Sequence, residues 1–499
     1  MFNIIKKTAK HSLVYGLGNL STKIIGFILL PFYTSYLSTS EYGILSLVEI
    51  TAWLLTAIVS VKINAAFFRW FWDKDYIEKR KSIFFSALVF FLLTSVVFLL
   101  PLFFLSDKIS LLLFETSNHS HLIVLMLVST ALQTIIQLVF HLMQLQEKAV
   151  FYSVTSILKL TLALVFTIIF ITTFGRGVNG IYEALIISQI FFLILTAKYI
   201  FSNIELKIET AIIKDMLVYS YPLMFAEISG IVLTVSDRYV LNFMTTTSDV
   251  GLYSLAYRLS NTIRVLIYSS VMMAVTPLIY QYIDKPNNGR FYSKIMTYLA
   301  FGVMIFVLFF SLFGKEIIEL VAKNKDYWPA SKLVPVLAFT IFLGILKDIS
   351  LNGLSIAKKT GIIAIVVVGI SLINILLNVL FIPHWGTLGA AVATLIARII
   401  SLIIFYKIAQ KHYFIPYEIK KVFIVIALGL TIVFVSSFTN ELKIYYTVLL
   451  KLLLLISFPF VLHRLNFFEE VELERIKEIW NVWKNPFKWK ENIKKIKLK

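Results

Sequence analysis

The chain has 499 residues, of which 59% are hydrophobic and 15% are charged. Soluble domains are about 45–50% apolar and about 25% charged, so this composition excludes an ordinary soluble protein and predicts an all-α polytopic membrane protein. The absence of cysteine excludes disulfides, thiolate metal sites and cysteine nucleophiles. The net charge of +19 identifies no partner until the basic residues have been located along the chain.

Apolar windows of about 20 residues predict about fourteen transmembrane helices. They lie near residues 11–37, 41–64, 83–105, 120–145, 153–173, 178–202, 215–244, 251–276, 296–313, 331–357, 361–381, 389–410, 421–438 and 445–463. No small-residue cleavage site follows the first basic run, so we expect residues 11–37 to be a span and not a signal peptide. The connections are too short to hold a separate soluble domain.

Lysine and arginine concentrate in alternate loops, as the positive-inside rule requires of cytoplasmic segments. These segments are 6–10, 69–81, 148, 198–214, 285–294, 358–359, 407–421 and the tail. We therefore expect both termini to be cytoplasmic, and the basic charge to mark topology and membrane-lipid contact. A nucleic-acid partner is not expected, because no soluble module could bind one.

Two pairs of motifs recur at an offset of about 208 residues. Residues 40–47 (SEYGILSL) match 248–255 (SDVGLYSL), and Gly177, Gly180 and Ala184 match Gly386, Gly389 and Ala393. The pairs fall on the second and sixth spans of each half, and six is an even number. This predicts two parallel six-helix repeats around a central cavity, related by an axis along the membrane normal.

The predicted organisation is an N-terminal six-helix bundle at 1–210, its repeat at 211–412, two extra helices at 413–463 and a cytoplasmic tail at 464–499. The tail carries acids first and bases last, with three tryptophans. It is either a basic amphipathic helix lying on the inner leaflet or a frayed basic end.

Further stretches carry a family resemblance, loosely as single motifs but specifically in their order and spacing. They are residues 30–34 (LPFYT), 41–43 (EYG), 66–71 (AFFRWF), 236–241 (SDRYVL), 251–258 (GLYSLAYR) and 382–394 (IPHWGTLGAAVAT). Over about residues 10–410 the chain resembles the bacterial polysaccharide flippases of the multidrug/oligosaccharidyl-lipid/polysaccharide exporter superfamily. Many relatives have twelve spans, and by analogy with the lipid II flippases the two extra helices here could hold a lipid tail.

The resemblance implies a flippase and not an enzyme. Its cargo would be an undecaprenyl-pyrophosphate-linked oligosaccharide, moved by alternating access from the inner to the outer leaflet of the bacterial cytoplasmic membrane. The product would feed O-antigen, capsule or another surface polysaccharide. No cofactor is implied beyond a proton or sodium gradient, and a polysaccharide polymerase and a chain-length regulator are the candidate protein partners.

Ionisable side chains inside apolar spans are the candidate functional residues. Burying a charge in a bilayer costs free energy, so such residues are rare and usually functional. A pyrophosphate cargo needs cations, and arginine and lysine bind phosphate by bidentate and point-charge contacts respectively. The helical rise of about 1.5 Å per residue places four cations near mid-depth and a fifth in the outer third. We expect these five to bind the cargo: Lys23, Arg264, Lys347, Arg398 and, towards the outside, Arg258.

Other charges have alternatives that the sequence leaves open. Structural or gating roles are expected for Glu49, Lys62, Asp237 and Arg238. Asp237 with Arg238, and Lys347 with Asp348, could be local pairs that only hold helices together. Lys62 and Lys159 could extend to the inner surface.

Glu227 is the candidate for ion coupling, because burial can raise the pKa of a carboxyl enough for it to carry a proton. The alternative is a salt bridge to one of the arginines, and the sequence does not select proton over sodium. No metal site is predicted, since His119 and His121 lie in an outer loop without further ligands.

Three other classes of protein fit the sequence less well. An ion-coupled drug or metabolite antiporter of the same superfamily would favour an acidic cavity, whereas this one is predicted to be cationic. A membrane-embedded polysaccharide polymerase would need outer loops that carry catalytic groups, and the outer loops here are short. A channel is disfavoured because parallel halves imply rocking domains.

Overall fold

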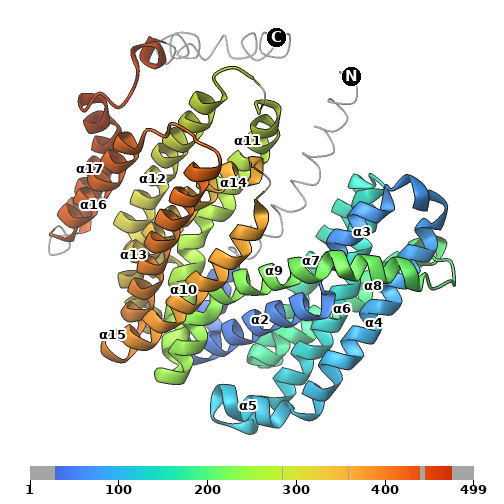
Figure 1. Ribbon diagram of the computed structural model, residues 1–499. Helices are drawn as coiled ribbons and strands as arrows, with labels where there is room; N and C mark the ends of the chain where they lie inside the picture. Colours follow the sequence, from blue (N-terminus) through green and yellow to red (C-terminus); the bar gives the residue numbers. More distant parts are fainter. Residues whose placement is uncertain (1–28, 284, 358, 439–443, 475–499) are drawn as a thin grey trace, which may run out of the picture. The chain divides into compact units, whose positions relative to one another are not determined.

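The computed structural model describes residues 29–283, 285–357, 359–438 and 444–474 (Figure 1). Every regular element in these ranges is helical, and 11 helices are long and apolar enough to cross a membrane. The prediction of an all-α polytopic membrane protein is therefore confirmed. Lys23, most of the first predicted span and residues 475–499 of the predicted tail lie outside the described residues.

The first half consists of consecutive helices joined by short turns. They are α2 (Thr39–Ser60), α3 (Ile63–Phe71), η1 (Lys74–Lys79), α4 (Arg80–Phe104), α5 (Ser106–Phe114), η2 (Ser117–His119), α6 (Ser120–Leu145), α7 (Ala149–Thr172) and α8 (Gly177–Ser202). Their core consists of apolar side chains from α3, α4 and α6 that pack against Ile212 and Met216, at the start of the helix that follows α8. Phe67, Phe84 and Phe91 in this core are wholly buried.

The second half also consists of consecutive helices in its described residues. Its elements are α9 (Thr210–Met244), α10 (Thr247–Thr262), the π-helical turn η3 (Ile263–Tyr268), α11 (Ser269–Gln281), α12 (Asn288–Val321), η4 (Lys325–Leu333), α13 (Val334–Ser350), α14 (Asn352–Ile356) and α15 (Thr360–His412). Helix α15 packs along α9 (Figure 1). The last two helices of the described residues are α16 (Ile419–Ser437) and α17 (Ile444–Arg464).

The number of spans differs from the predicted fourteen for identifiable reasons. Helix α15 contains two predicted spans, which meet at Gly386, where φ is +53° and the helix kinks. The predicted span at 251–276 is interrupted by η3, so neither α10 nor α11 alone is long enough to cross. The first predicted span is only partly described. Fourteen spans remain a prediction.

Contacts between residues group the chain into two compact units. One covers the chain to Ile283 together with Gly314–Phe414, and the other covers Asp284–Phe313 together with the chain from Ile415. Within the second unit, Lys294 of α12 pairs with Glu418 at 3.1 Å and with Glu469 at 2.6 Å. The division into two six-helix repeats and two extra helices comes from the sequence pattern and remains a prediction.

Candidate functional site

The repeated motifs form the first turns of α2 and α10, which cross each other. Both turns are capped in the same way: the Ser38 hydroxyl accepts from the Glu41 amide and the Thr246 hydroxyl accepts from the Asp249 amide, each at 3.2 Å. Such caps satisfy amide groups that a helix start leaves free. The repeat detected in the sequence is thus a pair of helix starts brought together.

Two glycines allow the helices to approach at this crossing. A Cβ on Gly43 would lie 1.8 Å from the Thr247 carbonyl oxygen, and one on Gly251 would lie 2.0 Å from the Thr39 carbonyl oxygen. Only a residue without a side chain fits at either position. This is the close helix packing that small residues permit inside membranes.

The hydrogen bonds across this crossing are reciprocal. Thr39 pairs with Ser248 at 2.7 Å, and Ser40 pairs with Thr247 at 2.6 Å. Ser46 meets its own equivalent, Ser254, at 2.7 Å and 208 residues away. An exchange in which i contacts j while j contacts i is the pattern of a twofold axis.

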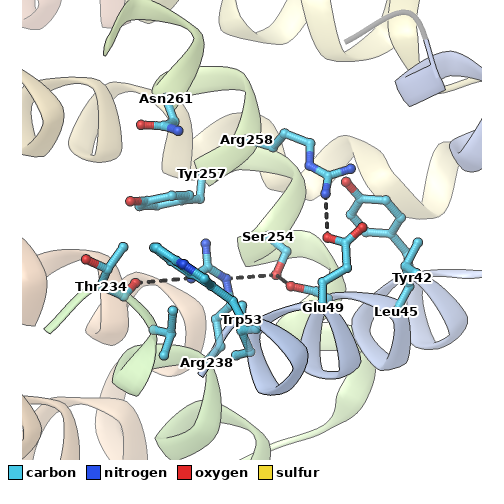
Figure 2. A pocket seen from close by; sticks show the side chains of 13 residues that line it. Tyr42, Leu45, Glu49, Trp53, Thr234, Arg238, Ser254, Tyr257, Arg258 and Asn261 are labelled. Atoms are coloured by element: carbon cyan, nitrogen blue, oxygen red, sulfur yellow. Dashed lines mark hydrogen bonds and ion pairs between the residues drawn. The ribbon is translucent and has the colours of Figure 1, made fainter. Parts of the chain in front are cut away.

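A cavity of about 180 Å³ lies beside the crossing, between α2, α9 and α10 (Figure 2). Arg258 donates to Glu49 there at 2.6 Å, and both side chains are about a third exposed. Figure 2 also shows Trp53, Tyr257 and Asn261 around this space. Arg258, predicted to contact cargo on the outward path, therefore reaches the cavity while joined to a predicted gating residue of the other half.

Asp237 and Arg238 form a buried network on α9. The Tyr253 hydroxyl donates to Asp237 at 2.5 Å, and Arg238 donates to the Ser254 hydroxyl and to the Thr234 carbonyl, each at 3.2 Å. The Arg238 guanidinium lies 3.6 Å from Asp237 and 4.4 Å from the centre of the Tyr257 ring. The network ties α9 to α10 beside the crossing, and its structural or gating role remains a prediction.

Three of the predicted cargo-binding cations come together in the second half. Lys347 lies 2.5 Å from Asp348, and Arg264 contacts the other oxygen of the same carboxylate. Arg398 interacts electrostatically with Lys347 and Asp348, and among the described residues it has neither a hydrogen bond nor an ion pair. This group, called here the cation cluster (Arg264, Lys347, Asp348 and Arg398), holds three positive charges and one negative charge.

Two local backbone features lie beside the cation cluster. Arg264 lies in the π-helical turn η3, a distortion that is frequent at functional sites. Gly344 faces two of the arginines: its missing Cβ would lie 3.6 Å from Arg264 Nη1 and 4.0 Å from Arg398 Cδ. The Arg264 side chain is 37% exposed although its guanidinium contacts Asp348.

Glu227, the predicted ion-coupling residue, pairs with Lys62 at 2.7 Å and with no arginine among the described residues. The backbone is left-handed at Val61 (φ +46°) and Lys62 (φ +57°), where the predicted span at 41–64 breaks into α2 and α3. A branched residue seldom adopts this conformation, so the break is strained. Ser220 of α9 donates to the Lys62 carbonyl at 3.2 Å and helps to hold the break.

A second polar cavity, of about 240 Å³, lies between α6 and α7 in the first half. Lys159, which the sequence left free to extend to the inner surface, lines this cavity and lies 3.3 Å from the Gln133 amide oxygen. It has no carboxylate partner among the described residues. The His141 Nδ1 atom is buried without a hydrogen-bond partner. The i, i+4, i+8 spacing of Gln133, Gln137 and His141 places them on one helical face, so the sequence pattern itself could have predicted this polar surface.

Comparison with known proteins identifies the family. Residues 8–283, more than half of the chain, match the family described as polysaccharide biosynthesis protein. The chain belongs to this family. Residues 222–380 also match the family described as MatE.

Individual relatives agree with this assignment. The probable low-salt glycan biosynthesis flippase Agl15 of Haloferax volcanii is 25% identical over 228 residues, which cover 44% of this chain and 48% of that protein. The chain thus spans about half the length of this curated relative.

Two solved structures show the fold. The inward closed lipid II flippase MurJ matches with a TM-score of 0.73 and 17% identity, covering 91% of this chain and 99% of that one. An inward-facing multidrug resistance MATE transporter matches with a TM-score of 0.62 and 16% identity, covering 80% and 94%. At these low identities, the structural matches show that the chain shares the fold of these transporters, and they do not identify its cargo.

Proposed function

We propose that this protein is a flippase that moves an undecaprenyl-pyrophosphate-linked oligosaccharide from the inner to the outer leaflet of a bacterial cytoplasmic membrane. Both termini are placed on the cytoplasmic side, as the distribution of lysine and arginine requires. The family match and the description of Agl15 as a glycan biosynthesis flippase support a glycan-linked lipid as cargo. A polymerase and a chain-length regulator would act on the product.

The observation that carries the proposal is the cation cluster. Asp348 pairs with Arg264 and Lys347 and so neutralises about one of the three cations, while Arg398 has no carboxylate of its own among the described residues. A cation held inside a membrane span without a counterion is strongly unfavourable until an anion arrives. Pyrophosphate supplies two or more negative charges and acceptor oxygens that suit bidentate arginine contacts.

Alternating access requires α2 and α10 to separate at their crossing. The polar contacts between the two helices are weak enough to break during a transport cycle. They are three hydroxyl pairs and the Glu49–Arg258 ion pair, with glycines instead of interlocked side chains at the centre. Interhelical hydrogen bonds in membranes contribute about 0.6 kcal/mol each on average. The set therefore contributes about 2–4 kcal/mol, which a conformational cycle can overcome. The predicted topology places this crossing on the outer side.

Ion coupling is proposed to act at Glu227. Its partner Lys62 lies at the strained break between α2 and α3, so protonation of the carboxyl would remove the charge that holds Lys62 there. Glu227→Gln should abolish the dependence of transport on a pH gradient. Unchanged gradient dependence in this variant would rule out the coupling role of Glu227. The proposal that the cation cluster binds the cargo would still stand.

The test of the main proposal is exposure of a lipid-linked oligosaccharide in the outer leaflet of reconstituted vesicles. Arg264→Gln, Lys347→Gln and Arg398→Gln should each reduce the rate, whereas Lys74→Gln, at an exposed position in η1 at the very start of a candidate span, should not. Rates equal to wild type in all three variants would refute the role of the cation cluster.

The MatE match over residues 222–380 favours one second candidate, an ion-coupled drug antiporter. Such a protein usually binds cations, which the cation cluster would repel. Efflux of a cationic dye, measured in the same vesicles, separates the two activities. Dye efflux without oligosaccharide exposure would establish the antiporter.

A further inference from the structure

A third cavity lies away from the cation cluster, where α3, α4, α6 and α8 end or begin. Its volume is about 480 Å³. The lining, called here the end pocket, comprises Phe71, Trp72, Ile77, Glu78, Arg80, Lys81, Leu142, Leu145, Gln146 and Asn203. All ten residues lie in the first or last few turns of candidate spans or in the connections next to them, so we place the pocket near the boundary between bilayer and water.

Arg80 is the polar centre of the end pocket. Its Nε donates to the Phe71 carbonyl at 2.6 Å, and its guanidinium lies 4.7 Å from the centre of the Phe71 ring and 4.6 Å from that of Trp72. These contacts fix the side chain, and they leave the two terminal nitrogens as donors. Among the described residues Arg80 has no carboxylate partner.

The neighbouring charges leave the end pocket positive. Lys81 is exposed and makes no ion pair within the described ranges. Lys79 is already engaged with Glu209 at 3.8 Å, and Glu78 is the carboxylate of the lining. Two cations against one carboxylate give a site that attracts an anion, and the fixed arginine gives that anion a defined position.

Apart from the charged residues, Gln146 and Asn203, the lining is apolar. Phe71, Leu142 and Leu145 are buried and form the floor, whereas Trp72 is 56% exposed and Ile77 is 47% exposed. Tryptophan is enriched at the level of lipid head groups because its ring is amphipathic. A ligand that fits has an anionic head beside Arg80 and Lys81 and a hydrocarbon part along Trp72 and Ile77.

We propose that the end pocket binds a membrane glycerophospholipid with an anionic head group. The phosphodiester would accept from Arg80 and Lys81, and the acyl chains would cover Trp72 and Ile77. Basic pockets between membrane helices bind such head groups by the same chemistry. The bound lipid would join the ends of four helices of the first half, independently of what the protein transports.

Native mass spectrometry of the purified full chain, titrated with phosphatidylglycerol or phosphatidylcholine, tests this site. We expect phosphatidylglycerol to bind wild type more tightly than phosphatidylcholine, and to bind Arg80→Gln and Lys81→Gln about fivefold more weakly, the effect of one surface cation. Lys74→Gln removes the same charge from η1 outside the lining and should bind as wild type does. Lys81 is exposed and has no ion pair among the described residues, so that variant decides the test if Arg80→Gln folds poorly.

Three outcomes would overturn the proposal. Equal phosphatidylglycerol binding to Lys81→Gln and Lys74→Gln would show that the lining cations hold no head group. Displacement by glycerol 3-phosphate at similar concentration would show a site for a free phosphate. Displacement by undecaprenyl diphosphate at lower concentration would assign the pocket to the cargo.

Discussion

Alanine at either glycine of the α2–α10 crossing should force the two helices apart. On Gly43 the new Cβ would lie 1.8 Å from a backbone oxygen, whereas real Cβ atoms almost never come within 3.0 Å of another heavy atom. A gap of about 1.2 Å must therefore open, and no flexible side chain can move aside to provide it. The matched control is Gly230→Ala in α9, where nothing lies within 4 Å of the added carbon.

The size of the effect follows from overpacking. Extra carbons in a filled contact destabilise it by about 1–3 kcal/mol, which corresponds to a shift of about 5–150-fold in the equilibrium between closed and open crossings. The separation would also stretch the hydroxyl pairs Thr39–Ser248 and Ser46–Ser254, which are only 2.7 Å long. Gly43→Ala and Gly251→Ala should act alike, because their contacts are equivalent.

Cysteine labelling measures this shift on a chain that has no native cysteine. Ser46→Cys places a single thiol at a position that is 8% exposed when the crossing is closed. A membrane-impermeant maleimide added outside cells should label it slowly with Gly230→Ala and at least about fivefold faster with Gly251→Ala. Equal labelling rates in the two folded variants would refute the reasoning that this crossing closes the outer side.

Three further predictions concern other charges. Glu49→Gln and Arg258→Gln should each lower transport, and the exchanged pair Glu49→Arg with Arg258→Glu should recover part of it in a vesicle assay, because the ion pair would be restored. Arg398→Gln should weaken binding of inorganic pyrophosphate at least about tenfold in calorimetry, since it removes the cation without a carboxylate partner. A hydrogen bond from Lys294 holds the pKa of Glu469 below its ordinary value of 4.5. Thermal stability should therefore fall as the pH drops through 4.5 and below, and it should fall less steeply in Lys294→Gln.

Each of these has a result that would count against it. Additive losses in the exchanged pair would show that Glu49 and Arg258 act separately. Unchanged pyrophosphate affinity in Arg398→Gln would place the anion elsewhere. For Glu469, the carboxylate is stabilised in the folded state and its contribution is present above pH 4.5, so identical acid profiles in wild type and Lys294→Gln would contradict the assignment.

The sequence predicted the helical membrane fold, but it did not predict that the two copies of the repeated motif contact each other. Apolar length identifies spans because the bilayer leaves few alternatives. The repeat around Gly43 and Gly251 predicted two parallel halves, and the structure shows that its two copies meet at the crossing, where each glycine faces a backbone carbonyl of the other helix. Breaks within spans were missed at Lys62 and Ile263, because a left-handed pair and a π-helical turn leave no mark on hydropathy.

The candidate site was predicted less completely. Depth along a helix placed Arg264, Lys347 and Arg398 at a similar level, and the structure brings them together. Spacing within one helix could not show that Asp348 pairs with Arg264, since the contact joins two helices 84 residues apart. The sequence left open a salt bridge from Glu227 to an arginine, whereas the structure pairs Glu227 with Lys62, because the chain breaks at Lys62 in a way that hydropathy does not show.

A reversible lock on the crossing tests the central claim most directly. The hydroxyl oxygens of Ser46 and Ser254 lie 2.7 Å apart, so Ser46→Cys with Ser254→Cys should form a disulfide when oxidised. In reconstituted vesicles the oxidised protein should fail to expose a lipid-linked oligosaccharide in the outer leaflet, and reduction should restore the rate. Undiminished exposure with the disulfide fully formed would contradict transport through this crossing.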